Sequence, residues 1–379
     1  IGLIIQMLVA HLLIFRKTVA IDQQSLMAMA NKIVIKKVIY LYLISAILYP
    51  ILFTVALDFP QLTQVILLFA QLKSIFLVLL IILLIIRREH KFIITLILVF
   101  EFLAGFLTYF SSFKEVFLYG IIAYLTFAKS IKLSGIIRFL PFAAGLLILL
   151  IFWSATKEDY RKFVNQGSKA QQVQVSSTEA FGKLFDLGKG FDNEVFEKGL
   201  RLMLFRTEYI FFFSKVTNRI PGINDYEGGK VWSEAFRFAL VPRFLDPDKG
   251  IHDPSIKTSK YTGLKIAGMQ KGTSISIGYF GDSYIDFGPV GMMMPIAFIS
   301  LLMSLLFLMI QNFKLNLIFK YAIIITVLRN VGYFESDSMY FLGMFKNYFI
   351  IQPILYFFLY KMVNRYITKP RTPSGMQNR

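Results

Sequence analysis

The sequence predicts an all-α polytopic membrane protein, and three observations carry this prediction. Hydrophobic residues make up 56% of the 379 residues. Only 17% of the residues are charged, whereas soluble domains contain about 25%. Apolar stretches such as 65–86, 92–110 and 289–310 are long enough to cross the hydrocarbon core of a bilayer as helices. An ordinary soluble enzyme is therefore excluded.

Nine stretches are candidates for membrane spans. They are about 1–15, 37–57, 61–86, 92–110, 116–128, 139–153, 286–310, 317–333 and 339–360. They divide the chain into N-terminal transmembrane helices (1–153), a long connection (154–285), C-terminal transmembrane helices (286–360) and a tail (361–379). Because the chain begins with isoleucine inside an apolar run, we expect a truncated N-terminus that lacks one or more earlier segments.

The net charge of +18 is distributed by side of the membrane. One alternate set of connections, together with the C-terminal tail, contains 18 Lys and Arg, whereas the short connections 58–60, 111–115 and 334–338 contain one, Lys114. The 154–285 connection contains 19 Lys and Arg against 15 Asp and Glu, but connections of that length cross the membrane regardless of their charge. Cytoplasmic loops of membrane proteins are enriched in Lys and Arg. We therefore expect a cytoplasmic C-terminus and an outer 154–285 connection. Most of the excess of Lys and Arg over Asp and Glu then reflects the orientation of the chain in the membrane. We therefore expect no nucleic-acid partner.

The 154–285 connection is too long for a turn, and loops of this length usually carry function. Its nearly apolar stretch 199–216 contains Arg206 and Glu208, and charges inside a bilayer are costly. We expect this stretch to form a helix in the outer interface or packed on the bundle. The segment 231–240 has an apolar stripe at helical spacing, which is typical of an amphipathic interfacial helix.

The first motif in this connection is VPRFLDPDKG, residues 241–250. Its prolines fix turns, and Arg243 and Lys249 supply cations that suit diphosphate oxygens. The alternative interpretation is a surface turn in which the aspartates bend and cap the chain. Asp246 and Asp248 also form an Asp-x-Asp pattern that could chelate a divalent metal.

The second motif is GYFGDSYIDFGPVG, residues 278–291, which leads into the 286–310 span. Its glycines permit close backbone approach, and Asp282, Tyr284 and Asp286 place polar groups at the outer mouth of the span. Small residues at such a position are often packing devices. A carboxylate at this depth facing a basic loop is also a candidate general base.

Charged residues inside the spans are further candidates because intramembrane ionisable groups are expensive. Arg329 and Lys346 lie about one to two helical turns below the outer ends of their spans. They could reach outward to the acidic 335–337 turn, or hold a lipid diphosphate at headgroup depth. Lys73 and Glu101 lie deeper on consecutive antiparallel spans, which favours a structural ion pair over a proton relay.

The two motifs also carry a family resemblance. The V-P-R-x-L-x-P-x-K stretch at 241–249 and the F-G-D-x-Y-x-D-F-G-x-x-G stretch at 280–291 resemble bacterial oligosaccharide repeat-unit polymerases, the O-antigen and exopolysaccharide polymerase family. The resemblance implies a GT-C-like architecture and transfer of a glycan from undecaprenyl diphosphate to a lipid-linked repeat unit. It places that reaction at the outer face of the inner membrane. A flippase and a chain-length regulator of the same pathway are then expected partners.

This reaction requires cations for the leaving diphosphate and a base for the acceptor hydroxyl. The candidate bases are Asp282, which we favour, and then Glu208, Glu234 or His252. The candidate binding residues are Arg206, Arg243, Lys249, His252, Tyr284, Arg329 and Lys346. A single carboxylate base favours inversion at the anomeric carbon. We expect no cofactor and no metal requirement; the chain has no cysteine and three histidines, which excludes Cys-ligated zinc and a thiolate nucleophile.

Three alternatives remain open from the sequence. An O-antigen ligase would share the topology and the donor but deliver the glycan to a lipid A core. A flippase or transporter for lipid-linked glycans would place polar residues along several helices at mid-membrane, whereas here they concentrate at the outer mouth. A scaffolding membrane protein would not require a charged residue inside a span, such as Arg329.

Overall fold

The computed structural model describes most of the chain. The described residues are 2–15, 22–58, 66, 69–109, 112–128, 133–168, 173–207, 209–241, 246, 250, 252–266, 268, 274–333 and 335–369. Across these ranges the structure is helical, without β-strands, and the one β contact is an isolated bridge between Ile33 and Thr368. The predicted all-α fold is confirmed.

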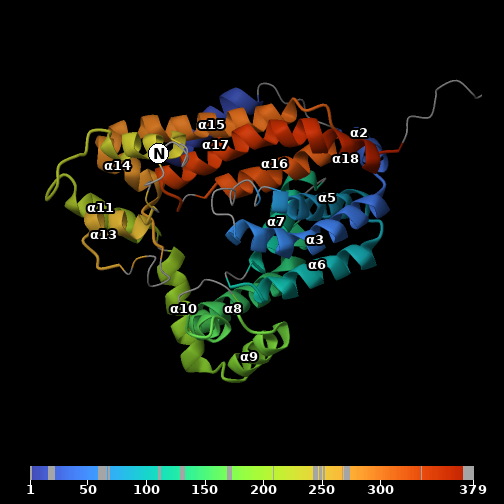
Figure 1. Cartoon of the computed structure of the whole chain (residues 1–379), viewed down its shortest axis with the longest axis horizontal. Coiled ribbons are helices and arrows are strands. Elements are labelled where there is room, and N and C mark those ends of the chain that lie inside the picture. The colour runs from blue at the N-terminus through green and yellow to red at the C-terminus, as the bar shows by residue number, and fades with distance from the viewer. Residues whose placement is uncertain are drawn as a thin grey trace, which may run out of the picture.

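The first half of the chain forms a succession of helices (Figure 1). They are α1 (Gly2–Ala10) continued by the π-helical turn η1 (His11–Phe15), α2 (Gln23–Asn31), α3 (Ile35–Asp58), α5 (Leu72–Arg87), α6 (Lys91–Phe106), α7 (Lys114–Phe127) and α8 (Leu133–Val164). Nine consecutive residues of α5, from Ile75 to Leu83, are buried. A helix that is apolar on every side belongs in a core, and α5 packs against α3, α7 and α16 (Leu317–Val331).

The second half begins with shorter helices and ends with long ones (Figure 1). The shorter helices are α9 (Ser177–Lys189), α10 (Asn193–Thr207), α11 (Tyr209–Arg219), α12 (Lys230–Leu240), α13 (Pro254–Thr262) and α14 (Gly278–Gly291). The long helices are α15 (Met293–Gln311), α16 and α17 (Ser338–Leu355), the last continued by η3 (Tyr356–Tyr360) and α18 (Lys361–Ile367). The helices α15, α16 and α17 pack against one another.

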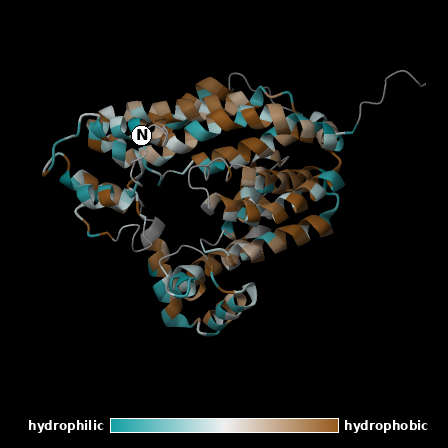
Figure 2. Cartoon of the chain, viewed as in Figure 1, coloured by the Kyte–Doolittle hydropathy of each residue, from teal (hydrophilic) through white to brown (hydrophobic). Residues whose placement is uncertain are grey.

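Four helices are long and apolar enough to cross a membrane among the residues that the structure describes. They cover Ile35–Ala56, Leu140–Val164, Met293–Gln311 and Ser338–Ile367. Figure 2 shows that hydrophobic residues dominate most of these long helices, whereas the helices of the long connection are more mixed. The other predicted spans also contain helices, but α5, α6, α7 and α16 have 16, 16, 14 and 15 residues. At 1.5 Å per residue these reach about 24 Å or less, short of the ~30 Å hydrocarbon core.

Both predicted boundaries of the long connection fall inside helices. The span expected to end at 153 continues to Val164, because Tyr160 and Val164 are buried with Trp153 in a small core. The hydroxyl of Tyr160 donates a hydrogen bond to the Phe106 carbonyl at 2.9 Å, which ties this extension to α6. The boundary at 285 falls within α14.

A kink at Gly288 interrupts α14 shortly before its end at Gly291. Gly288 has a φ of 69° and a ψ of −171°, a conformation that is open essentially only to glycine. The next residue, Pro289, has no backbone N–H to donate, so the helical hydrogen bonding is interrupted there. The predicted 286–310 span is therefore interrupted: its first residues belong to the end of α14, and α15 begins at Met293.

Two parts of the long connection contact the bundle as helices. On α12 the apolar stripe is present, with Trp232, Ala235 and Ala239 buried. This stripe packs on α17 and α14, so protein, rather than the expected membrane interface, covers it. The predicted 199–216 helix is divided between α10 and α11, and α10 packs along α8. Of the two positions that we expected for this stretch, in the outer interface or packed on the helical bundle, α10 has the second.

The helix ends that we expected on the cytoplasmic side meet one another. The Arg87 guanidinium donates hydrogen bonds to the carbonyls of Ala30 and Ile33 at 3.2 and 2.7 Å. At the same end, the Lys37 ammonium donates to the Tyr366 carbonyl at 2.7 Å. Residues near the start and the end of the chain are thus joined on one side of the bundle, which agrees with the alternating order of the spans.

Candidate functional site

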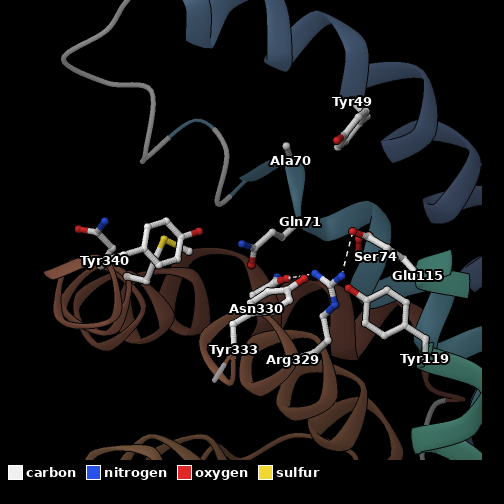
Figure 3. Close-up of a pocket in the computed structure, with 12 residues that line it drawn as sticks. Tyr49, Ala70, Gln71, Ser74, Glu115, Tyr119, Arg329, Asn330, Tyr333 and Tyr340 are labelled. Carbon is white, nitrogen blue, oxygen red and sulfur yellow. Dashed lines mark hydrogen bonds and ion pairs between the residues drawn. The ribbon is translucent and has the colours of Figure 1, made fainter. Parts of the chain in front are cut away.

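A cavity of about 360 Å³, lined by both polar and apolar groups, lies at the opposite ends of these helices (Figure 3). The helices α3, α5, α7, α16 and α17 all contribute side chains to its wall. Its lining includes Tyr49, Gln71, Ser74, Glu115, Tyr119, Arg329, Asn330, Tyr333, Tyr340, Met344 and Asn347. These are the helix ends that the distribution of Lys and Arg predicts to be extracytoplasmic.

Arg329 and Glu115 form an ion pair in the cavity (Figure 3). The Nη2 atom of Arg329 lies 3.0 Å from Oε1 of Glu115, and the two side chains are 9% and 34% exposed. The Nη1 atom donates a hydrogen bond to Oδ1 of Asn330 at 2.9 Å. The guanidinium also lies over the ring of Tyr333, 5.0 Å from its centroid. Arg329 is thus held on several sides by the wall of the cavity.

Local helix chemistry explains where these two charges stand. Glu115 lies in the first turn of α7, and Arg329 lies in the last turn of α16. A carboxylate near a helix N-terminus and a cation near a C-terminus both complement the helix dipole. Both positions are therefore compatible with stable helices, and the antiparallel packing of α7 and α16 brings the two charges together.

Two polar atoms beside the cavity are buried without a hydrogen-bond partner among the described residues: Nε of Arg329 and Oε1 of Gln71. Buried polar groups are almost always paired, so such atoms are candidates for ligand contacts. An arginine with free donor capacity suits a phosphate oxygen. The faces of the tyrosine rings can pack against the apolar faces of sugars. The cavity therefore combines groups for a phosphate with groups for a glycan.

A second cluster surrounds Asp282 at the interface of α13, α14 and α17. The Nζ atom of Lys257 lies 2.8 Å from Oδ2 of Asp282 and 3.1 Å from Oδ2 of Asp337. The His252 ring also contacts Asp337 through Nε2. Asp282 is fully buried, and its Oδ2 accepts hydrogen bonds from the backbone nitrogen and the hydroxyl of Ser338 at 2.8 and 2.7 Å.

The charges in this cluster shift the pKa values of its members. Burial would lower the pKa of the Lys257 ammonium, but the charges of Asp282 and Asp337 and their hydrogen bonds outweigh burial and raise it above its ordinary value. Burial would likewise raise the pKa of the Asp337 carboxyl, but the hydrogen bond from His252 and the charge of Lys257 hold it well below its ordinary value. The cluster is a buried network of opposite charges.

This cluster positions one wall of the cavity. Oδ1 of Asp337 accepts a hydrogen bond from the backbone nitrogen of Tyr340 at 2.9 Å and so caps the N-terminus of α17. The side chain of Tyr340 lines the cavity. Asp282, which we predicted to be the general base, therefore holds the start of α17. Asp282 is fully buried, and its Oδ1 has no hydrogen-bond partner among the described residues; its role as a general base stays a prediction.

The other predicted site residues are distributed over the structure. The hydroxyl of Tyr284 donates to the Ile220 carbonyl at 3.2 Å, and its ring packs against Phe213. The Lys346 ammonium donates to the Ala239 carbonyl at 2.6 Å, so it joins α17 to the end of α12. The structure thus brings Arg329 to the cavity, and neither Arg329 nor Lys346 makes the predicted contact with the 335–337 turn.

Several predicted residues lie outside what the structure describes. Glu208, Arg243 and Lys249 are among the residues that are not described, and only the backbone of Arg206 is described, as part of α10. Asp248 belongs to the same group. Among the described residues no group of three or more His, Cys, Asp or Glu is arranged to hold a metal ion.

The remaining intramembrane prediction concerns Lys73 and Glu101. Their side chains form an ion pair at 2.9 Å, and the hydroxyl of Tyr42 donates a hydrogen bond to Glu101. The predicted structural ion pair is confirmed.

Sequence reasoning missed Glu115 and the four tyrosines of the cavity. In the sequence Glu115 falls in the short outer connection 111–115, and tyrosines in apolar helices are usual core residues. The available signal was the spacing of Glu115 and Tyr119, which are four positions apart and therefore share one face of a helix.

The fold and the cavity define an all-helical protein with four helices able to cross a membrane and an arginine-containing cavity at the ends of its helices. The chain belongs to the family described as a domain of unknown function, DUF8712, which matches residues 6–368. No curated protein and no solved structure matches the chain.

Proposed function

We propose that this chain is a membrane glycosyltransferase of the bacterial inner membrane. It polymerises undecaprenyl-diphosphate-linked oligosaccharide repeat units into O-antigen, capsule or exopolysaccharide at the outer face. The proposal includes the nine spans, the GT-C-like architecture, the cytoplasmic C-terminus, and a flippase and a chain-length regulator as partners of the same pathway. It rests on the resemblance of the two sequence motifs and on the cavity around Arg329.

The recessed position of Arg329 is the observation that carries this proposal. A lipid diphosphate keeps its hydrocarbon tail in the bilayer, so its charged group sits at the depth of the helix ends. Arg329 is 9% exposed at such an end, and its Nε has no partner among the described residues. The guanidinium is paired with Glu115 in the structure, and the oxygens of a diphosphate are acceptors that suit the same planar donors.

The tyrosines support a sugar-bearing substrate. Tyr49, Tyr119, Tyr333 and Tyr340 line the same cavity as Arg329, as Figure 3 shows. A glycosyl diphosphate needs both a cation for the diphosphate and flat surfaces for the sugar, and the cavity offers both. A charge on the leaving diphosphate grows in the transition state, so a fixed guanidinium would also accelerate the transfer.

The test uses purified protein in detergent with lipid-linked repeat units extracted from the native host, and glycan length as the readout. Arg329→Lys keeps the charge but loses the planar fork, and we expect the rate to fall by about 10²-fold. Arg329→Ala should abolish polymer formation. Arg365→Lys is the matched control, because Arg365 is an exposed residue of α18.

The same assay separates the rival functions. Polymer formation that is normal in both Arg329→Lys and Arg329→Ala contradicts the proposal. Transfer to a lipid A core without extension of repeat units identifies a ligase. Movement of lipid-linked glycans across proteoliposome membranes without glycosidic bond formation identifies a flippase.

A further inference from the structure

Glu115 is placed where a reacting hydroxyl could reach it. It is the one acidic residue among the described residues that line the cavity, and its side chain is 34% exposed. Asp282, the carboxylate that the sequence favoured, is 0% exposed and accepts two hydrogen bonds from Ser338. A general base must lie within hydrogen-bond reach of the proton that it removes. Glu115 meets this requirement better than Asp282.

In the structure Glu115 is engaged in the ion pair with Arg329. A diphosphate would compete with Glu115 for the guanidinium, since both are anions and both suit the same donors. Repulsion between the diphosphate and the carboxylate would add to this competition. Arg329 is anchored by Asn330 and by the Tyr333 ring, whereas Glu115 is the more exposed partner. Binding of the donor therefore displaces Glu115 rather than Arg329.

Resting on the proposed function, we infer that Glu115 is the catalytic base, released from Arg329 when the donor diphosphate binds. The acceptor hydroxyl oxygen forms a bond to the anomeric carbon of the donor. The bond from that carbon to the diphosphate oxygen breaks, and its electron pair leaves with the undecaprenyl diphosphate. The hydroxyl proton passes to Glu115, which later releases it to water.

Glu115→Gln tests this role because glutamine keeps the shape and an oxygen acceptor for Arg329 but cannot accept the proton. We expect glycan extension to fall by about 10²- to 10⁴-fold. Binding of undecaprenyl diphosphate, measured in detergent micelles with inorganic pyrophosphate as competitor, should be equal to wild type or tighter, because the competing charge is gone. Arg329→Ala should lose this binding.

Two further variants control the experiment. Glu115→Asp keeps a carboxylate one methylene shorter, and it should retain more activity than Glu115→Gln. Glu194→Gln should extend glycans normally, because Glu194 is an exposed carboxylate in the first turn of α10 and thus matches the helical position of Glu115.

The outcomes separate this inference from the proposed function. If wild type extends repeat units and Glu115→Gln does so equally well, Glu115 is not the base and the proposed function stands. If Glu115→Gln loses diphosphate binding together with activity, Glu115 only positions Arg329, and the inference is overturned. If wild type extends no lipid-linked repeat units and binds no undecaprenyl diphosphate, the proposed function itself fails. Equal losses in Glu115→Asp and Glu115→Gln also contradict a catalytic carboxylate.

Discussion

Asp282 and Ser338 join α14 to the N-terminus of α17. One carboxylate oxygen of Asp282 accepts hydrogen bonds from both the backbone nitrogen and the hydroxyl of Ser338, at 2.8 and 2.7 Å. The same oxygen contacts the Lys257 ammonium at 2.8 Å. Lys257 of α13 and Ser338 of α17 thus meet at one buried carboxylate oxygen of Asp282. This contact fixes the turn from which Tyr340 reaches the cavity.

Asp282→Asn is expected to destabilise the protein by about 3 kcal/mol, the lower end of the range for breaking a buried ion pair, because Asp337 still contacts Lys257. Thermal unfolding in detergent measures this loss. Asp225→Asn, at an exposed position of the same connection, should leave unfolding unchanged. Normal unfolding of Asp282→Asn with loss of glycan transfer would instead restore Asp282 as the base.

The stabilising effect of Asp337 is expected to depend on pH. Its pKa is lowered from the ordinary value of 3.8, so its contribution is fully present above pH 3.8 and is lost as the pH falls further, through the folded-state pKa. The stability difference between wild type and Asp337→Asn should therefore be constant near neutral pH and shrink below pH 3.8. A constant difference down to pH 2 would contradict the ionic role.

The contribution of Lys257 to stability is expected to change with pH in the opposite direction, and at high pH. Its pKa is raised above the ordinary value of 10.5, so its contribution is complete below pH 10.5 and declines as the pH rises through the folded-state value. The stability difference between wild type and Lys257→Met, followed by the unfolding temperature in detergent, should narrow only above pH 10.5.

Gly199→Ala is expected to separate α10 from α8. A Cβ atom at Gly199 would lie 2.3 Å from the Ile151 carbonyl oxygen and 3.1 Å from Cβ of Ala155, so the helices must move apart. Overpacking of this kind costs about 1–3 kcal/mol. Gly182→Ala is the matched control, since nothing lies within 4 Å of its Cβ position in α9. It should be neutral or stabilising by up to about 1 kcal/mol, and equal unfolding temperatures for the two variants would refute the close contact.

The ion pair of Lys73 and Glu101 is expected to behave as a structural pair. Lys73→Met or Glu101→Gln alone leaves one buried charge without its partner, which costs about 3–5 kcal/mol. The double variant removes both charges and should be more stable than either single variant. A double-mutant cycle of unfolding free energies measures this coupling. Additive losses would show that the two charges act independently.

The topology is expected to place α10 outside and the α5–α6 connection inside. The chain has no cysteine, so single cysteines can be introduced directly at Lys198 and Lys91, both exposed. In intact spheroplasts an impermeant maleimide should label Lys198→Cys, whereas Lys91→Cys should react only after lysis. The reverse pattern would invert the proposed orientation and move the cavity to the cytoplasmic side.

The sequence by itself determined the all-helical class and the pairing of Lys73 with Glu101. Both follow from local rules: runs of apolar residues form helices, and opposite charges at equal depth on adjacent antiparallel helices lie within reach of each other. The sequence also identified Arg329, because a cation inside an apolar stretch stands out without any structural knowledge.

Only the tertiary structure decided what Arg329 and Asp282 contact. Arg329 pairs with Glu115, which is 214 positions away in the chain, and Asp282 pairs with Lys257 and Ser338. Such contacts depend on which helix ends the packing brings together, and apolar faces of similar composition permit many packings. Whether a carboxylate lines a cavity or is enclosed by a charge network is therefore set by the arrangement of helices and not by the residues beside it in the sequence.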